Sequence, residues 1–554
     1  MDGVDESDMD SSGTDAGGLD AASGGGRVYP WVAVLLAAAS VLQPLSWELH
    51  EAPLADAVPA LLITAAFAVV VWLVAAALRR RADAGAALIA CVWVVGSLYY
   101  LELVRHLNRA LGGDYSMVRP LPVALGVMIA LTFGLGGARR WHGLVHTVMA
   151  CIAVALLARP VWVVADFEWR HGAATAAYDA DRAMAAMPAL AQTGGAEGEA
   201  PDIYHIVFDR YGSEETLREH YGVREPIGAF LESKGFYVAR DSFANYVSTG
   251  HSLASTFAMD YLTELAADPR VFGANWLPLF EMMDDSRVGR FLRGQGYEIE
   301  QFGSWWAGTH HNPHADRNFA PGLGEFDMAY GRRTILMPIL HLLPDTPLTM
   351  QLDWDNGQCQ RIARQVEAIK RTGDGERPAY VFAHILVPHG PYVFAPDGRC
   401  LGQKESEARG EPKGYAAQVA YADTIIEDLV DTLLAEGRRP AVLLIQADEG
   451  PIPARDMRVP WQDAPDEELR IKFGILSAYH FPDGDYRRLR QDLSPVNSYR
   501  AILGNEFGLD LPELPDRMYV FPDHTSIWDL HDVTDRVRCA APAGPMDETH
   551  LPPC

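Results

Sequence analysis

The sequence predicts two parts of different class: an α-helical membrane domain of about five transmembrane helices, then an α/β domain with a mostly parallel central sheet. Residues 28–167 are dominated by Ala, Val and Leu in long runs, whereas residues 201–554 read like a soluble protein. In this second part, short apolar runs alternate with helical patterns, which is typical of strands covered by helices on both faces.

Five apolar windows predict the membrane domain. A helix needs about 20 apolar residues to cross the hydrocarbon core of a bilayer. The windows are residues 29–47, 56–78, 85–104, 119–137 and 143–165, of which the fourth is the weakest because it is rich in Gly and has Pro near its start. Because five such windows in succession rarely occur in a soluble core, we interpret them as transmembrane helices in a lipid bilayer.

The distribution of arginine predicts the orientation. The loops after the second and fourth windows are basic, with Arg79, Arg80, Arg81, Arg139 and Arg140, and the loop after the first has no Lys or Arg. Basic loops stay in the cytoplasm. The third loop conflicts in part, with Arg105, Arg109 and Arg119. On balance we expect a multi-pass protein of the bacterial inner (plasma) membrane, with a cytoplasmic N-terminus and a periplasmic or extracellular C-terminal domain.

Two segments outside these parts have no predicted fold. The first 26 residues carry six Asp, one Glu and no basic residue, so we expect residues 1–27 to be disordered. Residues 168–200 are predicted as a linker, with a flexible hinge at TGGAEGEA. The net charge of −27 argues against nucleic acid as a partner.

The predicted outer domain contains four cysteines, Cys359, Cys400, Cys539 and Cys554. Disulfides persist outside the cytoplasm, and four cysteines allow three pairings, among which the sequence does not choose. No CxxC motif occurs, so a thiolate zinc site is not expected.

Three apolar runs predict neighbouring parallel strands: IYHIVF (203–208), AYVFAHILV (379–387) and AVLLIQA (441–447). Helical spacing of apolar residues occurs between them, at 217–234 and 415–437. In open parallel sheets, functional sites form at the carboxyl ends of the strands. The residues after each run are therefore the candidates for chemistry.

Charged and imidazole side chains follow all three runs. Asp209 and Arg210 follow the first, His389 follows the second, and Asp448 and Glu449 follow the third. Strand-to-loop turns favour Asp in any case. Adjacent carboxylates past a buried strand are costly, however, unless something such as a divalent metal compensates their charge.

A hydroxyl-rich segment, residues 244–255, lies between the first two of these strands and contains Thr249. A Ser or Thr at a helix start is most often an N-cap. The same position suits a metal-activated nucleophile, since a helix N-terminus also favours anions.

These segments, in this order, resemble the sulfatase-like branch of the alkaline phosphatase superfamily over about residues 201–520. PDIYHIVFDRYG is similar to the family's first strand and its metal-binding acid, here Asp209, and FANYVSTGHSLASTFAMDYL resembles its nucleophile segment, here with Thr249. HILVPHGPYVF is similar to its His-rich stretch, here with His384 and His389, and LLIQADEGP to its late Asp-His-Gly metal motif. The helices before the domain resemble the architecture of lipoteichoic acid synthases and lipid A phosphoethanolamine transferases.

The resemblance departs from the family pattern at three points. The late motif has Glu449 where the family usually has a metal-binding His, which would shift preference from zinc towards Mn, Mg or Ca, or would mean that the site is lost. The first acid is Asp209, as in sulfatases, whereas the two transferase families typically use Glu. No Cys stands in the nucleophile segment, so the formylglycine chemistry of true sulfatases is not available.

The resemblance implies a divalent metal (Mn, Mg, Ca or Zn) held by four residues, Asp209, Thr249, Asp448 and Glu449. Thr249 would attack the ester, and His389 would bind a leaving-group oxygen or donate a proton. Arg210 would hold the charged ester, unless it forms only a surface salt bridge. His384 would also contact the substrate, although a core histidine fits its apolar surroundings equally well.

A loop at residues 303–314, after the apparent strand YEIEQFG, adds clustered Trp and His side chains. Trp305 and His310 are predicted there as a substrate wall for a sugar or lipid head group, with an ordinary packed loop as the alternative.

Two functions follow as expectations. The first is a membrane-anchored metal-dependent hydrolase or transferase of phosphate or sulfate esters, acting on small-molecule, lipid-linked or glycan substrates of the cell envelope. The alternative is a catalytically inactive relative that binds an envelope glycan or protein or acts as an assembly factor, for which Glu449 is the main support. Bound metal distinguishes the two.

Overall fold

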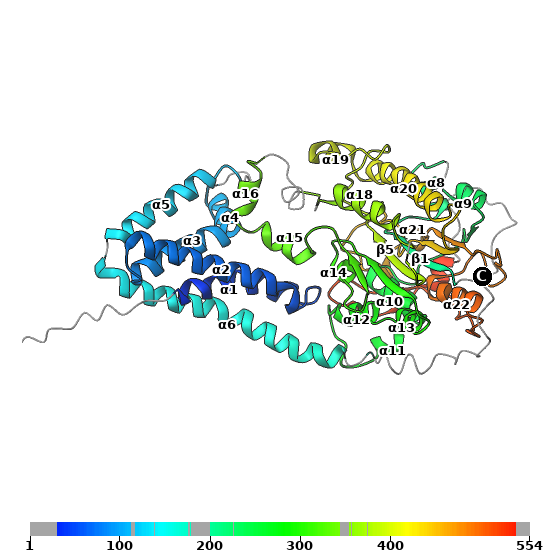
Figure 1. Ribbon diagram of the computed structural model, residues 1–554, viewed down its shortest axis with the longest axis horizontal. Coiled ribbons are helices and arrows are strands. Elements are labelled where there is room, and N and C mark those ends of the chain that lie inside the picture. The colour runs from blue at the N-terminus through cyan, green and yellow to red at the C-terminus, as the bar shows by residue number, and fades with distance from the viewer. Residues whose placement is uncertain are drawn as a thin grey trace, which may run out of the picture.

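The computed structural model of the chain describes residues 30–111, 117–137, 139–175, 178, 200–224, 227–343, 354–355, 357–373 and 375–538. The predicted disordered segment 1–27, most of the predicted linker 168–200, and Cys539 and Cys554 lie outside these residues. Figure 1 shows an elongated molecule, with a bundle of long helices at one end and an α/β domain at the other.

All five predicted membrane windows are helical. The helices are α1 (Trp31–Glu48), α2 (Leu54–Arg79), α3 (Ala84–Leu98), α4 (Tyr100–Leu111), α5 (Leu121–Gly137) and α6 (His142–Thr175). α6 continues to Thr175, inside the range predicted as linker. The Asp83 side chain caps α3 by accepting from the backbone N–H of Ala86.

The predicted count of about five spans is not confirmed. Among the described residues, α1, α2 and α6 are long and apolar enough to cross a membrane, and α3 with α4 makes a fourth only if this pair, bent by 72°, is one span. α5 is apolar but shorter. The third sequence window runs across the bend because hydropathy does not register a change of direction, and α4 carries its polar residues on one face.

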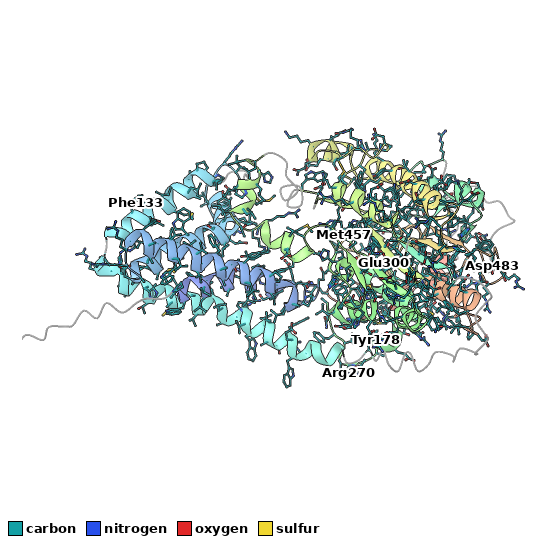
Figure 2. All side chains as sticks on the ribbon, viewed as in Figure 1. Phe133, Tyr178, Arg270, Glu300, Met457 and Asp483 are labelled. Carbon is teal, nitrogen blue, oxygen red and sulfur yellow. A yellow bond between two sulfur atoms is a disulfide. The ribbon has the colours of Figure 1, made fainter. Side chains whose placement is uncertain are left out.

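The two basic loops of the bundle lie side by side. Atoms of Arg79 and His142 both fall within 3 Å of the position that a Cβ atom on Gly85 would occupy. In Figure 1 this end of the bundle, where α2 meets α3 and α5 meets α6, is the one remote from the α/β domain. Apolar side chains cover the outside of the bundle, as Figure 2 shows for Phe133 on α5, which is 77% exposed.

The α/β domain is built on one seven-stranded sheet with the order β2-β7-β6-β1-β5-β3-β4. The strands are β1 (Asp202–Phe208), β2 (Tyr237–Val238), β3 (Glu298–Phe302), β4 (Arg317–Phe319), β5 (Ala379–Ile385), β6 (Ala441–Gln446) and β7 (Ser477–His480). Strands β6, β1, β5, β3 and β4 are mutually parallel, and β7 pairs antiparallel with both β6 and β2. The predicted mostly parallel sheet is confirmed.

The three apolar runs are the central strands β1, β5 and β6, and every residue in them is buried. Their register aligns Phe208 with Ile385, and Val207 with both His384 and Gln446. The carboxyl ends of the three strands therefore meet at one edge of the sheet. A small antiparallel pair, β8 (Tyr519–Val520) and β9 (His531–Asp532), lies apart from the main sheet.

Helices cover both faces of the sheet; in Figure 1, α18 and α20 lie on one side and α10, α12 and α13 on the other. The helices are α8 (Glu214–His220), α9 (Gly228–Ser233), α10 (Thr249–Ala258), α11 (Thr263–Ala266), α12 (Leu277–Asp284), α13 (Arg287–Gly294), α14 (Ala307–His310), α15 (Glu325–Gly331), α16 (Leu336–Leu340), α18 (Gln358–Ile369), α19 (Gln403–Arg409), α20 (Glu411–Leu433), α21 (Asp466–Phe473), α22 (Ser498–Glu506) and α23 (Thr534–Arg538). The helical pattern at 217–234 is two helices, because the chain turns at Gly222 with φ +70°.

A disulfide joins Cys359 in α18 to Cys400 in the loop after β5, and closes a sequence separation of 41 residues. Such a bond stabilises the fold mainly by restricting the unfolded chain. The structure thereby selects one partner for Cys359 among those that the sequence leaves open.

The segment that contains α15 and α16 docks the α/β domain on the membrane helices. The Tyr330 hydroxyl lies 2.8 Å from the Ser40 hydroxyl of α1, and the backbone N–H of Ile335 donates to the Ser97 carbonyl of α3 at 2.7 Å. Arg333 lies between them, with carboxylates of α1 and α4 within 4 Å of its guanidinium. The two parts are therefore joined by direct contacts as well as by the chain between them.

Candidate active site

Three buried side chains meet at the carboxyl edge of the sheet: Asp209 after β1, His384 near the end of β5, and Asp448 after β6. One ligand atom from each lies within 4.8 Å of the others, and the three residues are 2%, 0% and 3% exposed. Asp209 Oδ1, Asp448 Oδ2 and His384 Nε2 are buried without a hydrogen-bond partner in the described part of the chain. Unsatisfied buried polar atoms need an explanation, and a set of two carboxylates and one imidazole suits a divalent cation.

A second contact orients His384. Its Nδ1 lies 2.8 Å from the Thr309 hydroxyl, which is itself 2.9 Å from the Ser304 hydroxyl. When Nδ1 carries the proton in this contact, the Nε2 lone pair faces Asp209, whose Oδ2 is 3.3 Å away. The expectation that His384 contacts substrate stays a prediction, and its position beside two carboxylates also suits a metal ligand.

The two carboxylates of this group differ in proton affinity. Burial, followed by the charge of Asp209, raises the pKa of Asp448 to about 7. Burial also acts to raise the pKa of Asp209, but the neighbouring His389, His384 and Arg210 outweigh it and hold that pKa below its usual range. Near neutral pH a proton therefore competes for Asp448, and a divalent cation bound there would displace it.

Thr249 is the first residue of α10 and stands next to this group. Its hydroxyl lies close enough to Asp448 to act against the rise in the pKa of that carboxyl, and its side chain is partly exposed. The N-cap position belongs to Ser248, which makes no side-chain capping bond. Thr249 is thus not the cap of α10; its hydroxyl lies at a helix start, where the dipole favours an anion.

Glu449 faces two cations. Its Oε1 accepts from Arg210 Nε at 2.8 Å and lies 2.7 Å from Lys472 Nζ, and the Glu449 and Lys472 side chains are each 2% exposed. Glu449 is outside the group formed by Asp209, His384 and Asp448. Its role as a metal ligand stays a prediction, which this ion pairing does not favour.

Sequence reasoning missed Lys472, which stands on α21 beside the strand end. The backbone N–H of Gly450 donates to the Lys472 carbonyl at 2.8 Å, and a Cβ atom on Gly450 would lie 2.3 Å from the Ile471 carbonyl oxygen. Only glycine permits this approach of α21. A signal was present in the sequence, because Lys472 interrupts an otherwise apolar run, but nothing there indicates its partner.

We expect Glu449→Ala to lower the free energy of unfolding by about 3–5 kcal/mol, because it leaves the buried Lys472 ammonium and the Arg210 guanidinium without their shared carboxylate. Thermal and denaturant unfolding of the full chain in detergent would measure the loss. Glu513→Ala is the matched control, since Glu513 pairs with Arg490 at an exposed position and such pairs contribute less than about 1 kcal/mol. Equal losses in both variants would contradict the buried ion pairing.

Arg210 adopts a left-handed backbone conformation, with φ +65°. For a residue other than glycine this costs on the order of 1 kcal/mol and persists only where the surroundings hold it. The Tyr415 hydroxyl donates to its carbonyl at 2.8 Å, and its N–H donates to Asp448 Oδ1 at 3.3 Å. The Arg210 side chain remains 26% exposed, so its guanidinium can contact a bound ligand.

His389 lies beside Asp209, whose carbonyl accepts from the backbone N–H of His389 at 3.1 Å. The Nδ1 atom contacts the Gly390 carbonyl, which only accepts hydrogen bonds, so Nδ1 carries the proton and Nε2 is left as an acceptor. Burial, followed by the charge of Arg210, lowers the pKa of His389 to about 4. The ring is therefore neutral at physiological pH.

The predicted substrate wall is divided between two places. Trp305 Nε1 donates to Gln358 Oε1 at 3.2 Å, and Gln358 Nε2 donates to the His389 carbonyl, so Trp305 supports the loop of His389. His310 lines a cavity between the start of α2 and the α/β domain, together with Asp284. Neither belongs to the group of Asp209, and their contact with substrate stays a prediction.

Comparison with solved structures finds proteins of similar fold. The C-terminal periplasmic domain of EcEptC from Escherichia coli is 12% identical, covers 63% of this chain and 97% of its own, and has a TM-score of 0.38. The phosphonate monoester hydrolase of Agrobacterium radiobacter is 14% identical, with coverage of 58% and 80% and a TM-score of 0.39. The soluble domain of lipooligosaccharide phosphoethanolamine transferase A from Neisseria meningitidis is 14% identical, with coverage of 57% and 90% and a TM-score of 0.34.

No family model matches the chain, and no curated protein matches it significantly. The structural likenesses are distant. At these identities and TM-scores they do not assign this chain an activity, so the functional argument rests on the geometry of the site.

Proposed function

We propose that this protein is a membrane-anchored, metal-dependent enzyme of the sulfatase-like type, which hydrolyses or transfers phosphate or sulfate esters with Thr249 as nucleophile. The observation that carries the proposal is the buried group of Asp209, His384 and Asp448 beside the partly exposed hydroxyl of Thr249, which lies close to Asp448. Orphaned ligand atoms and an activatable hydroxyl together are typical of metal-assisted ester chemistry.

Asp209, His384 and Asp448 would hold the divalent metal, with the Thr249 hydroxyl as a further ligand. The metal, when bound, lowers the pKa of a ligated hydroxyl and neutralises charge on the ester. Mn, Mg, Ca and Zn are all candidates, since oxygen ligands suit the first three and the imidazole also suits zinc.

The side chains divide the reaction into two steps. The Thr249 hydroxyl, which lies close to Asp448, loses its proton to solvent. Thr249 Oγ1 then forms a bond to phosphorus or sulfur as the bond to the leaving oxygen breaks, and the leaving oxygen departs with the electron pair of that bond and takes its proton from solvent. The partly exposed guanidinium of Arg210 binds the non-bridging oxygens of the ester. In the second step, Nε2 of the neutral His389 accepts a proton from water or from an acceptor alcohol, which attacks the ester and releases Thr249.

We place the domain of residues 201–554 outside the cytoplasm, anchored by the helices within residues 28–167. Both basic loops lie at the end of the bundle remote from the α/β domain, which supports a cytoplasmic N-terminus. The disulfide between Cys359 and Cys400 supports an oxidising compartment. From the inner membrane, the site would face lipid-linked or glycan esters of the cell envelope.

The proposal is tested on the full chain purified in detergent, stripped with chelator and then supplied with Mn, Mg, Ca or Zn at pH 8. We expect stoichiometric binding of a divalent ion by elemental analysis and ion-dependent release of p-nitrophenol from bis-p-nitrophenyl phosphate or p-nitrophenyl sulfate. A protein that binds no ion and is inert towards both esters would contradict the proposal and favour the inactive glycan- or protein-binding relative.

A further inference from the structure

An apolar groove opens on the membrane domain along the line where α3 and α5 meet. Its volume is about 540 Å³, and its lining is almost entirely apolar. The walls are formed by Val95 and Gly96 of α3 and by Ala124 and Val127 of α5, and α6 contributes Met149 at one end. Figure 1 shows α3 and α5 as neighbours in the bundle, away from the sheet.

The described part of the chain leaves this groove unfilled, and its apolar surroundings favour one kind of occupant. Helices that cross a bilayer are surrounded by hydrocarbon, and an apolar space of this size does not hold ordered water. An acyl chain has the chemistry and the elongated shape that the groove accepts. In a bilayer, the acyl chains around the helices would have direct access to this groove.

The end of the groove nearest the α/β domain is formed by α4, whose Leu103 and Leu107 line it. The opposite face of α4 carries Arg105 and Arg109. Arg105 pairs with Glu102 at 3.2 Å. Arg109 is exposed and has no hydrogen bond or ion pair to any residue that the structure describes.

These arginines are the ones that conflict with the distribution of basic residues in the other loops. Basic residues that set membrane orientation lie on the cytoplasmic side. The arginines of α4 lie at the other end of the bundle, which faces the α/β domain, so they need a different explanation. They are explained if the bend between α3 and α4 lays an amphipathic helix along the membrane surface, with its basic face towards lipid phosphates.

We propose that the groove between α3 and α5 binds one acyl chain of a glycerophospholipid from the leaflet that faces the α/β domain, with the lipid phosphate at Arg109. The lipid would enter beside Leu103 and Leu107. This site is separate from the group of Asp209, and the inference does not depend on the proposed ester chemistry.

The acyl-chain site is tested with the full chain in nanodiscs that contain phosphatidylglycerol with a photoactivatable acyl chain. We expect labelled peptides from the groove-lining parts of α3 and α5 to exceed those from α2, whose exposed Leu62, Ile63 and Val70 lie outside this groove. Ala124→Phe, which fills the groove, should abolish this excess. Gly126→Phe is the matched control, because no atom lies within 4 Å of a Cβ atom there.

Val95→Phe fills the groove from the opposite wall, on α3. It provides a second test of the groove in case Ala124→Phe fails to fold. Folding of each variant is checked by its elution as a single species and by its helical circular dichroism. Equal labelling of α2 and of the groove, or labelling unchanged in both folded groove variants, would overturn the proposal in favour of ordinary annular lipid.

The phosphate contact is tested by native mass spectrometry of co-purified phospholipid. Arg109→Gln should lower retention by roughly fivefold, because one arginine near a lipid surface contributes about that much. Arg140→Gln, at the remote basic end of the bundle, should leave retention unchanged. Equal effects of the two variants would overturn the assignment of the phosphate to α4.

Discussion

Thr249→Ala is expected to reduce ester cleavage by at least about a thousandfold while the protein still folds and still binds a divalent ion. The variant removes the hydroxyl and the γ-methyl group that lie beside Asp448, whereas Asp209, His384 and Asp448 keep their positions at the strand ends. Release of p-nitrophenol in single-turnover experiments, with ion content measured on the same sample, separates loss of the nucleophile from loss of the metal.

Two variants at the same helix start provide the controls for this prediction. Thr249→Ser keeps a hydroxyl and should retain most of the activity. Ser248→Ala removes the neighbouring hydroxyl, which makes no capping bond, and should retain both activity and stability. If Thr249→Ala remains as active as Ser248→Ala, then Thr249 is not the nucleophile.

Asp448→Asn is expected to weaken divalent metal binding by at least about a hundredfold, since it keeps the shape of the side chain but removes a charged ligand. Competition with a chromophoric chelator measures the affinity. The titration is made at pH 8, because the pKa of Asp448 is raised to about 7 by burial and by the charge of Asp209, so below that value a proton competes with the ion. Affinity in the unaltered protein should accordingly fall as the pH is lowered through 7.

Glu449→Gln is the matched control for that experiment, because it makes the same change of charge at the adjacent residue. The Glu449 carboxylate faces Arg210 and Lys472, so metal affinity should change by less than about threefold. An equal loss in both variants would show that Glu449 ligates the ion, as the resemblance of the late motif implies, and would contradict the division of roles proposed from the structure.

The sheet and the three strand ends could be predicted from sequence, because a strand that is buried on both faces consists almost entirely of apolar residues. The runs at β1, β5 and β6 are continuously apolar, and parallel strands bring their carboxyl ends to the same edge. Asp209 and Asp448 directly follow two of these runs, so their place in the site can be predicted without knowing the conformation of the loops.

The remaining parts of the site depend on contacts that no local pattern records. Thr309 reaches His384 only through the path of the loop after β3. Lys472 reaches Glu449 because Gly450 lets α21 approach the strand end. The predicted number of spans is not confirmed for a similar reason, since hydropathy does not record the change of direction at Tyr99, which divides the third window into two helices.

The docking of α15 and α16 on the membrane helices limits how far the proposed active site can move relative to the membrane. The Tyr330 hydroxyl is hydrogen-bonded to the Ser40 hydroxyl, and the Ile335 N–H to the Ser97 carbonyl. With the proposed membrane anchoring, these contacts would hold the reactive centre at a fixed distance from the bilayer, which a flexible linker would not do. Esters at that distance would meet the proposed active site at a high effective concentration, whereas esters nearer to or farther from the membrane surface would not. The contacts between the two parts would then make substrate selection depend on the distance of the ester from the membrane.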